Sequence, residues 1–236
     1  MDRRTVKLQG FCIDTFSQEE ALEFAQSGQV ITINPEMVVN AKKNPEFAKI
    51  IREAQLVIPD GIGVETGLRI LGAKVKRIPG IEFAAKLLER SAGKPVALIG
   101  ASHSVIEKTV KNLHNVNIVY YHDGFFDDPA GIIERLKEKQ PAILLAAMGS
   151  PKQEEFIYNL KEILPNTLMA GVGGSFDVWA GEAERAPLIL RKLGLEWLYR
   201  TVKEPKRFKR IFPALPLFIL EVIIEKVTGY VYVKQR

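Results

Sequence analysis

The sequence predicts an α/β fold in which a mostly parallel sheet carries helices on both faces. Short apolar, β-branched runs alternate with amphipathic stretches from residue 5 to about residue 195, which is the pattern of repeated strand–helix–strand units. Glycine-containing turns follow several of these runs, as expected where a parallel strand leads into a crossover helix. The pattern changes after residue 195. We therefore expect a Rossmann-like core and a C-terminal helical appendage.

Seven segments are expected to form strands because each is short, apolar and bounded by polar or turn-forming residues. They span residues 5–13, 29–33, 55–58, 95–99, 116–121, 142–147 and 167–170. Helices are expected between them, and two show N-terminal signals. Ser17 and Glu20 have the spacing of a capping box, and Asn34 precedes a proline suited to a first helical position. The other helices are expected near residues 45–54, 61–72, 80–91, 103–113, 129–139 and 151–161.

Composition indicates a globular protein with a sizeable core, since 47% of the 236 residues are hydrophobic. The single cysteine, Cys12, allows no internal disulfide, which suits a reducing cytoplasm. The N-terminus lacks the apolar segment of a signal peptide, and no run of about 18 apolar residues predicts a membrane span.

Positive charge is concentrated at the C-terminus. Residues 200–236 contain nine Lys and Arg against three Asp and Glu, whereas residues 1–199 are nearly neutral. Six of these basic residues lie within 200–210, and a ten-residue apolar run with two prolines follows at 211–220. We interpret residues 195–236 as an appendage that associates with an anionic membrane surface, attached to a catalytic core of residues 1–194. The alternative is a C-terminal helix packed on the core with a solvated basic face.

Polar side chains at predicted strand ends define a candidate catalytic group. Asp60 follows strand 55–58, and Thr32 and Asn34 lie at the end of strand 29–33. Ligands of open α/β sheets bind beyond the carboxyl ends of the strands. The sequence therefore places the Asp60 carboxylate at the mouth of a cleft, although an N-cap in a tight turn is the alternative for this residue.

Glycine-rich turns at three other strand ends are candidate sites for a nucleotide diphosphate, because backbone N–H groups at helix N-termini favour phosphate. Their residues are Gly100 in the first turn, Gly149, Ser150, Pro151, Gln153 and Glu154 in the second, and Gly174, Phe176 and Asp177 in the third.

Missing motifs limit the chemistry. The sequence contains no P-loop, no HExxH, no Cys/His cluster and no Asp-x-Asp after a strand, so we expect neither a metal nor a cofactor. Charge on a departing diphosphate would then be neutralised by helix N-termini and arginines. The candidates are Arg77 and the tail residues Arg200, Arg207 and Arg210.

An ordered set of short motifs resembles the WecG/TagA/CpsF family of glycosyltransferases over nearly the whole chain, with Glu82 where the family leads us to expect Asp. The set comprises Thr32-x-Asn34, Pro59-Asp60-Gly61, Arg77-x-x-Gly80, Gly149-x-Pro151-Lys152-Gln153-Glu154, Gly171-Val172-Gly173-Gly174-x-Phe176-Asp177, Gly181, Arg185-Ala186-Pro187, Gly194-Leu195-Glu196-Trp197-Leu198-x-Arg200 and Glu204-Pro205-x-Arg207-x-x-Arg210.

The resemblance implies an inverting transfer of N-acetylmannosamine from UDP to N-acetylglucosamine carried on undecaprenyl diphosphate. Within the family the sequence is most similar to the TagA type, which primes the linkage unit of wall teichoic acid. Asp60 would then be the general base, and Thr32 and Asn34 would orient sugar hydroxyls. The protein would work in the cytoplasm, peripherally bound to the inner face of the membrane. A different family sugar, such as N-acetylmannosamine uronic acid or glucose, is an alternative, and a homo-oligomer stays open.

Two other classes share parts of the pattern. A nicotinamide-dependent oxidoreductase would have similar strand–glycine–helix turns, but its GxGxxG motif is absent at the first turn. A nucleic-acid-binding module would use the basic tail, yet an apolar run rather than stacking aromatic residues follows that tail. We therefore expect no nucleic-acid partner.

Overall fold

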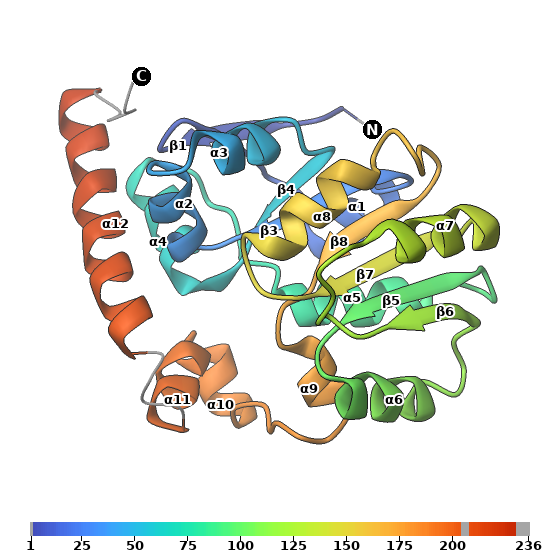
Figure 1. Cartoon of the computed structure of the whole chain (residues 1–236). Helices are drawn as coiled ribbons and strands as arrows, with labels where there is room; N and C mark the ends of the chain where they lie inside the picture. The colour runs from blue at the N-terminus through green and yellow to red at the C-terminus, as the bar shows by residue number, and fades with distance from the viewer. Residues whose placement is uncertain (1, 204–207, 230–236) are drawn as a thin grey trace.

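The computed structural model describes residues 2–203 and 208–229 and shows an open α/β sheet (Figure 1). The six strands lie in the order β4-β3-β8-β7-β5-β6, and every neighbouring pair is parallel. They are β3 (Gly28–Ile33), β4 (Leu56–Pro59), β5 (Val96–Gly100), β6 (Ile118–His122), β7 (Ile143–Ala147) and β8 (Leu168–Gly171). The predicted fold class is confirmed.

Helices cover both faces of this sheet, so β4, β5, β7 and β8 consist entirely of buried residues. Apolar residues of α1, α5, α6 and α9 pack on one face, and those of α3, α7 and α8 pack on the other. The helices of the core are α1 (Gln18–Phe24), α2 (Pro35–Ala41), α3 (Pro45–Arg52), α4 (Gly61–Ile70), α5 (Gly80–Glu89), α6 (His103–Asn112), α7 (Ala130–Lys139), α8 (Lys152–Leu160) and α9 (Ser175–Trp179).

The N-terminal capping signals predicted from the sequence are confirmed at two helices. Ser17 and Glu20 form the reciprocal capping box of α1, and the Asn34 side chain accepts a hydrogen bond from the Met37 N–H at 3.0 Å. Pro35 then occupies the first turn of α2. These contacts satisfy N–H groups that a helix start otherwise leaves unpaired.

The single strand expected over residues 5–13 is wrong. The segment forms an antiparallel hairpin of β1 (Thr5–Leu8) and β2 (Phe11–Asp14), separate from the main sheet. Gln9 and Gly10 both adopt positive φ angles and reverse the chain between the two strands. The two strands are only four residues each, and a single Gln-Gly pair between them is a weak turn signal, so the segment was predicted as one strand.

In the described part of the chain after residue 187, three helices form: α10 (Leu188–Lys192), α11 (Glu196–Lys203) and α12 (Phe208–Thr228). The apolar run at 211–220 lies within α12, which includes Pro213 and Pro216 and runs alongside α2 and α4 (Figure 1). Within residues 2–203 and 208–229, every helix is too short or too polar to cross a bilayer.

One side of α12 is part of the protein core. Phe218 and Val222 are fully buried among residues of α2, α4 and the hairpin. A polar cluster fixes the same helix, since Lys42 Nζ donates to the Glu221 carboxylate at 2.7 Å and the Gln9 N–H donates to Glu225 at 3.0 Å. The packed-helix alternative therefore describes this side of α12, and the division of the chain at residue 194 stays a prediction.

Removing the Phe218 side chain tests this packing. We expect Phe218→Ala to lower the free energy of unfolding by about 3–5 kcal/mol, because the change leaves a cavity in the core. Phe212→Ala is the matched control on the same helix, since Phe212 is 56% exposed, and we expect a loss below about 1 kcal/mol. Urea denaturation measures both values, and equal losses would show that α12 does not pack as described.

Candidate functional site

A cleft of about 1010 Å³ opens at the carboxyl edge of the sheet, where β3, β4, β7 and β8 end, and α10, α11 and α12 border its other side. This is the expected position of a ligand in an open α/β fold. The cleft is lined by nine of the residues predicted from the sequence, namely Thr32, Asn34, Asp60, Arg77, Gly149, Ser150, Gln153, Gly174 and Asp177.

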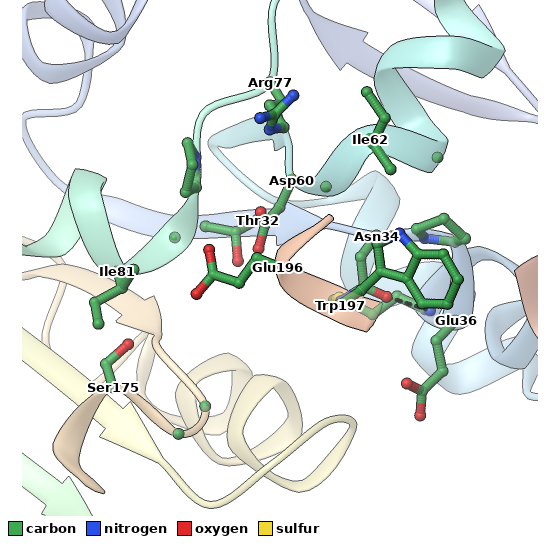
Figure 2. A pocket seen from close by; sticks show the side chains of 18 of the residues that line it. Thr32, Asn34, Glu36, Asp60, Ile62, Arg77, Ile81, Ser175, Glu196 and Trp197 are labelled. Atoms are coloured by element: carbon green, nitrogen blue, oxygen red, sulfur yellow. Dashed lines mark hydrogen bonds between the residues drawn. The ribbon is translucent and has the colours of Figure 1, made fainter. Parts of the chain in front are cut away.

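Asp60 lies between β4 and α4 with an extended backbone, and its N–H donates to the Ile33 carbonyl at 2.8 Å. Asp60 occupies the N-cap position of α4, as the alternative expected, but its side chain makes no capping hydrogen bond to the helix. Figure 2 shows the Asp60 carboxylate directed into the same space as Thr32 and the Glu196 carboxylate. The structure thus brings Asp60 and Thr32 together and places a second acidic residue, Glu196 of α11, at the same site.

Two other predicted residues also have structural contacts. Asn34 caps α2 through its side-chain oxygen, as described above. Arg77 donates to the Glu65 carboxylate at 3.1 Å and to the Arg191 carbonyl at 2.5 Å. Arg77 therefore joins the loop after α4 to α10 and stands at the cleft wall with its guanidinium held in place.

Gln153 supports the glycine-rich turn that follows β8. Its side-chain oxygen accepts a hydrogen bond from the Gly173 N–H at 3.0 Å. Gly171 leaves the room that this side chain needs, because a Cβ at position 171 would lie 2.4 Å from Gln153 Nε2. Gln153 of α8 therefore fixes the position of the turn at Gly173 and Gly174.

Glu154 lies beneath the cleft rather than in it, with 3% of its surface exposed. Gln153 Nε2 donates to its Oε1 atom at 2.7 Å, and among the described residues its Oε2 atom has no hydrogen-bond partner. Burial raises the pKa of Glu154, and hydrogen bonds from Gln153 and Ser150 offset only part of this effect. The structure favours a neutral carboxyl group that steadies the Gln153 amide.

Besides Glu154, three predicted site residues among the described ones do not line the cleft: Gly100, Pro151 and Phe176. Gly100 allows close packing of β5 on β7, since a Cβ there would lie 2.4 Å from the Ala147 carbonyl oxygen. Phe176 is fully buried in the core. Of the predicted tail arginines, Arg207 and the side chains of Arg200 and Arg210 lie outside the described residues.

Sequence reasoning assigned no role to a charged network at the rim. Arg185 donates to Glu82 at 3.0 Å and to Glu196 at 3.3 Å, and Arg191 lies 3.7 Å from Glu82. Burial lowers the pKa of Arg185, but Glu196 and Glu82 outweigh this effect and raise it. Glu82 and Arg185 lie far apart in the chain. The available sequence signal was that Arg185 and Glu196 belong to the family-like motifs and that Glu82 stands where the family leads us to expect Asp.

Metal-binding potential is low in the part of the chain that the structure describes. Residues 2–203 and 208–229 contain no group of three or more His, Cys, Asp or Glu side chains placed to hold a metal ion. The expectation of metal-independent chemistry stays a prediction, and the cationic candidates near the cleft are Lys76, Arg77, Arg191 and Lys192.

The fold and the cleft define an α/β protein with a ligand crevice at the carboxyl edge of its sheet. The model of the glycosyl transferase WecG/TagA/CpsF family matches residues 6–231. The chain belongs to this family, and the class of enzyme is therefore a glycosyltransferase. The match confirms the family that the motifs indicated and gives no support to the oxidoreductase or nucleic-acid-binding alternatives.

Replacing Glu154 with Gln tests the neutral carboxyl group. The pKa of Glu154 is raised in the folded state, so above the ordinary pKa of glutamate the folded protein keeps a proton that the unfolded chain has lost. The free energy of unfolding of the wild type therefore falls as the pH rises through this range. Glu154→Gln removes this loss. We expect the stability of Glu154→Gln relative to wild type, measured by urea denaturation, to rise as the pH increases from about 5 to 8.

Glu162→Gln is the control, because Glu162 is exposed and lies just after the end of α8. We expect it to follow the wild-type dependence of stability on pH. A constant difference between Glu154→Gln and wild type over this range would mean that Glu154 does not carry the proton.

Proposed function

We propose that this enzyme transfers N-acetylmannosamine from UDP to N-acetylglucosamine on undecaprenyl diphosphate, with inversion at the anomeric carbon, in the synthesis of the wall teichoic acid linkage unit. The observation that carries the proposal is the Asp60 carboxylate, which points into the cleft beyond β4 without capping α4. A carboxylate in that position suits a general base for a sugar hydroxyl.

In the proposed reaction, Asp60 accepts the proton of an acceptor hydroxyl while that oxygen forms a bond to the anomeric carbon of the donor. The bond from this carbon to the diphosphate oxygen breaks, and UDP leaves with the bonding electrons. Thr32, at the end of the neighbouring strand, would orient a donor hydroxyl. Asn34 would do the same with the part of its amide that does not cap α2.

The diphosphate is assigned to the opposite part of the cleft. Backbone groups line this part of the cleft at Gly149, Ser150, Gly173 and Gly174. Gln153 holds the turn at Gly173 and Gly174 in place. Arg77 and Arg191 at the wall would offset the charge of the leaving UDP. Arg200, Arg207 and Arg210 are proposed to supply further positive charge that offsets the leaving UDP.

The acidic side chains of the cleft bear on the choice of donor. Acidic residues outnumber basic ones in the lining by six to four; they are Glu36, Asp60, Glu65, Glu82, Asp177 and Glu196, against Lys76, Arg77, Arg191 and Lys192. A uronic acid would bring a further carboxylate among these groups, and like charges repel in a partly buried site. The cleft therefore favours a neutral N-acetylated sugar over the uronic acid of the family alternative.

An enzyme whose acceptor is linked to a lipid has to act at a membrane surface. The side of α12 away from the core exposes apolar residues next to the basic segment at 200–210; these residues are Phe212, Leu217, Leu220, Ile223, Ile224 and Val227. Apolar side chains beside clustered positive charge suit an interface with anionic lipid. We propose peripheral binding at the cytoplasmic face of the membrane.

Asp60→Asn tests the proposed base. We expect kcat to fall by about 10²–10⁴-fold, because the amide accepts no proton, while the dissociation constant for UDP changes little. Coupled UDP-release kinetics and calorimetry measure the two quantities. Asp127→Asn, which alters an exposed carboxylate outside the cleft, should match wild type. Wild-type turnover by folded Asp60→Asn would remove Asp60 from the mechanism.

Membrane binding is tested by the triple variant Lys203→Gln, Lys206→Gln and Lys209→Gln. Each basic residue near anionic lipid contributes about 1 kcal/mol, so we expect roughly 100-fold weaker sedimentation with vesicles of phosphatidylglycerol and phosphatidylcholine. The matched control replaces the exposed Lys111, Lys137 and Lys139 of α6 and α7. Equal sedimentation of both variants would argue against the tail as the membrane contact.

A further inference from the structure

Trp197 occupies a place in the cleft that the proposed reaction has not used. It is the second residue of α11, its indole is only partly buried, and it lines the cleft rather than the core. Figure 2 shows the indole in the same part of the cleft as Asn34 and Glu36, at the start of α2. An indole face exposed in a ligand cleft offers a large, rigid and apolar contact area.

The start of α11 is fixed by charge. Glu196, next to Trp197, accepts a hydrogen bond from Arg185 at 3.3 Å, and Arg185 also donates to Glu82 on α5 at 3.0 Å. The Arg185 guanidinium thus joins α11 to the opposite wall of the cleft. Because this network holds the helix start, Trp197 meets a ligand without first having to be ordered.

The two ends of the cleft differ in chemistry. The end at Gly149 and Gly173 is built of glycine backbone beside the Asp177 carboxylate, whereas the end at Trp197 carries the indole and the Glu36 carboxylate. Glycine backbone offers N–H donors to phosphate, whereas a carboxylate beside an apolar ring face accepts hydrogen bonds from hydroxyl groups. An uncharged ring with hydroxyls on its edge and C–H groups on its face therefore suits the Trp197 end.

Residues of α12 continue this end of the cleft. Ala214 and Leu215 line it, and Leu215 lies close to Gly63 and Pro35. The same helix also exposes apolar side chains to the outside of the protein. A sugar that is linked to a lipid leaves the cleft on this side without passing the glycine-rich end, whereas the donor sugar has to stay beside its diphosphate.

We propose that Trp197 and Glu36 form the subsite for the acceptor sugar, with the indole packed against the C–H face of its ring and Glu36 accepting from a ring hydroxyl. The inference rests on the proposed function for the identity of the acceptor, and it assigns the recognition of that sugar to α11 and α2.

Steady-state kinetics of Trp197→Ala tests the subsite. With a short-chain alkyl diphosphate of N-acetylglucosamine as acceptor, we expect KM for the acceptor to rise about tenfold or more, which corresponds to the loss of one aromatic contact. KM for UDP-N-acetylmannosamine should stay within about twofold of wild type, and Trp197→Phe should recover most of the acceptor affinity. Leu198→Ala is the control, since Leu198 is exposed on α11 outside the cleft.

A binding measurement separates this inference from the proposed reaction. The chain has two tryptophans, so Trp179→Phe leaves Trp197 as the only indole reporter. We expect its fluorescence to change saturably with the acceptor analogue and not with UDP, whether or not any sugar is transferred. No response to the analogue, an equal response to UDP, or equal rises of both KM values in Trp197→Ala would overturn the subsite.

Discussion

The site depends on the parallel pairing of β3 with β4. The register places Thr32 opposite Ile58 and Ile33 opposite Pro59, and the Asp60 N–H extends the ladder by donating to the Ile33 carbonyl. This pairing puts Asp60 beside Thr32 at the edge where the strands end. A one-residue slip would turn every side chain of the strand to the other face of the sheet, so the position of the proposed base follows from the sheet itself.

The other wall of the cleft comes from the last third of the chain, which is attached by ion pairs and hydrogen bonds near α10 and α11 and by apolar packing at α12. Arg77 binds Glu65 and the carbonyl of Arg191, and Arg185 bridges Glu82 and Glu196. Phe218 adds a fully buried apolar contact between α12 and the core. The C-terminal helices thus have one side that completes the cleft and another that faces outward, which suits an enzyme whose acceptor would arrive from a lipid surface.

Sequence patterns predicted the parallel core, two helix caps and nine of the residues that line the cleft, because strand ends and glycine turns are local signals that a parallel sheet brings to one edge. The hairpin at Gln9 and Gly10 was missed because its strands are only four residues each and a single Gln-Gly pair is a weak turn signal. Gly100 was predicted to bind phosphate, whereas its missing side chain makes room for Ala147. The bridge from Glu82 through Arg185 to Glu196 was not predictable, since no local pattern records which distant charges meet.

The central claim is that this cleft transfers a sugar from UDP to a lipid-linked acceptor. The most direct measurement incubates the protein with separate UDP-sugars and a short-chain alkyl diphosphate of N-acetylglucosamine, and identifies each product by mass and by the anomeric coupling in its NMR spectrum. We expect transfer from UDP-N-acetylmannosamine, a product heavier by one N-acetylhexosamine residue, and an inverted anomeric configuration. A retained configuration, or no transfer from any UDP-sugar under conditions in which the protein is folded, would contradict the account.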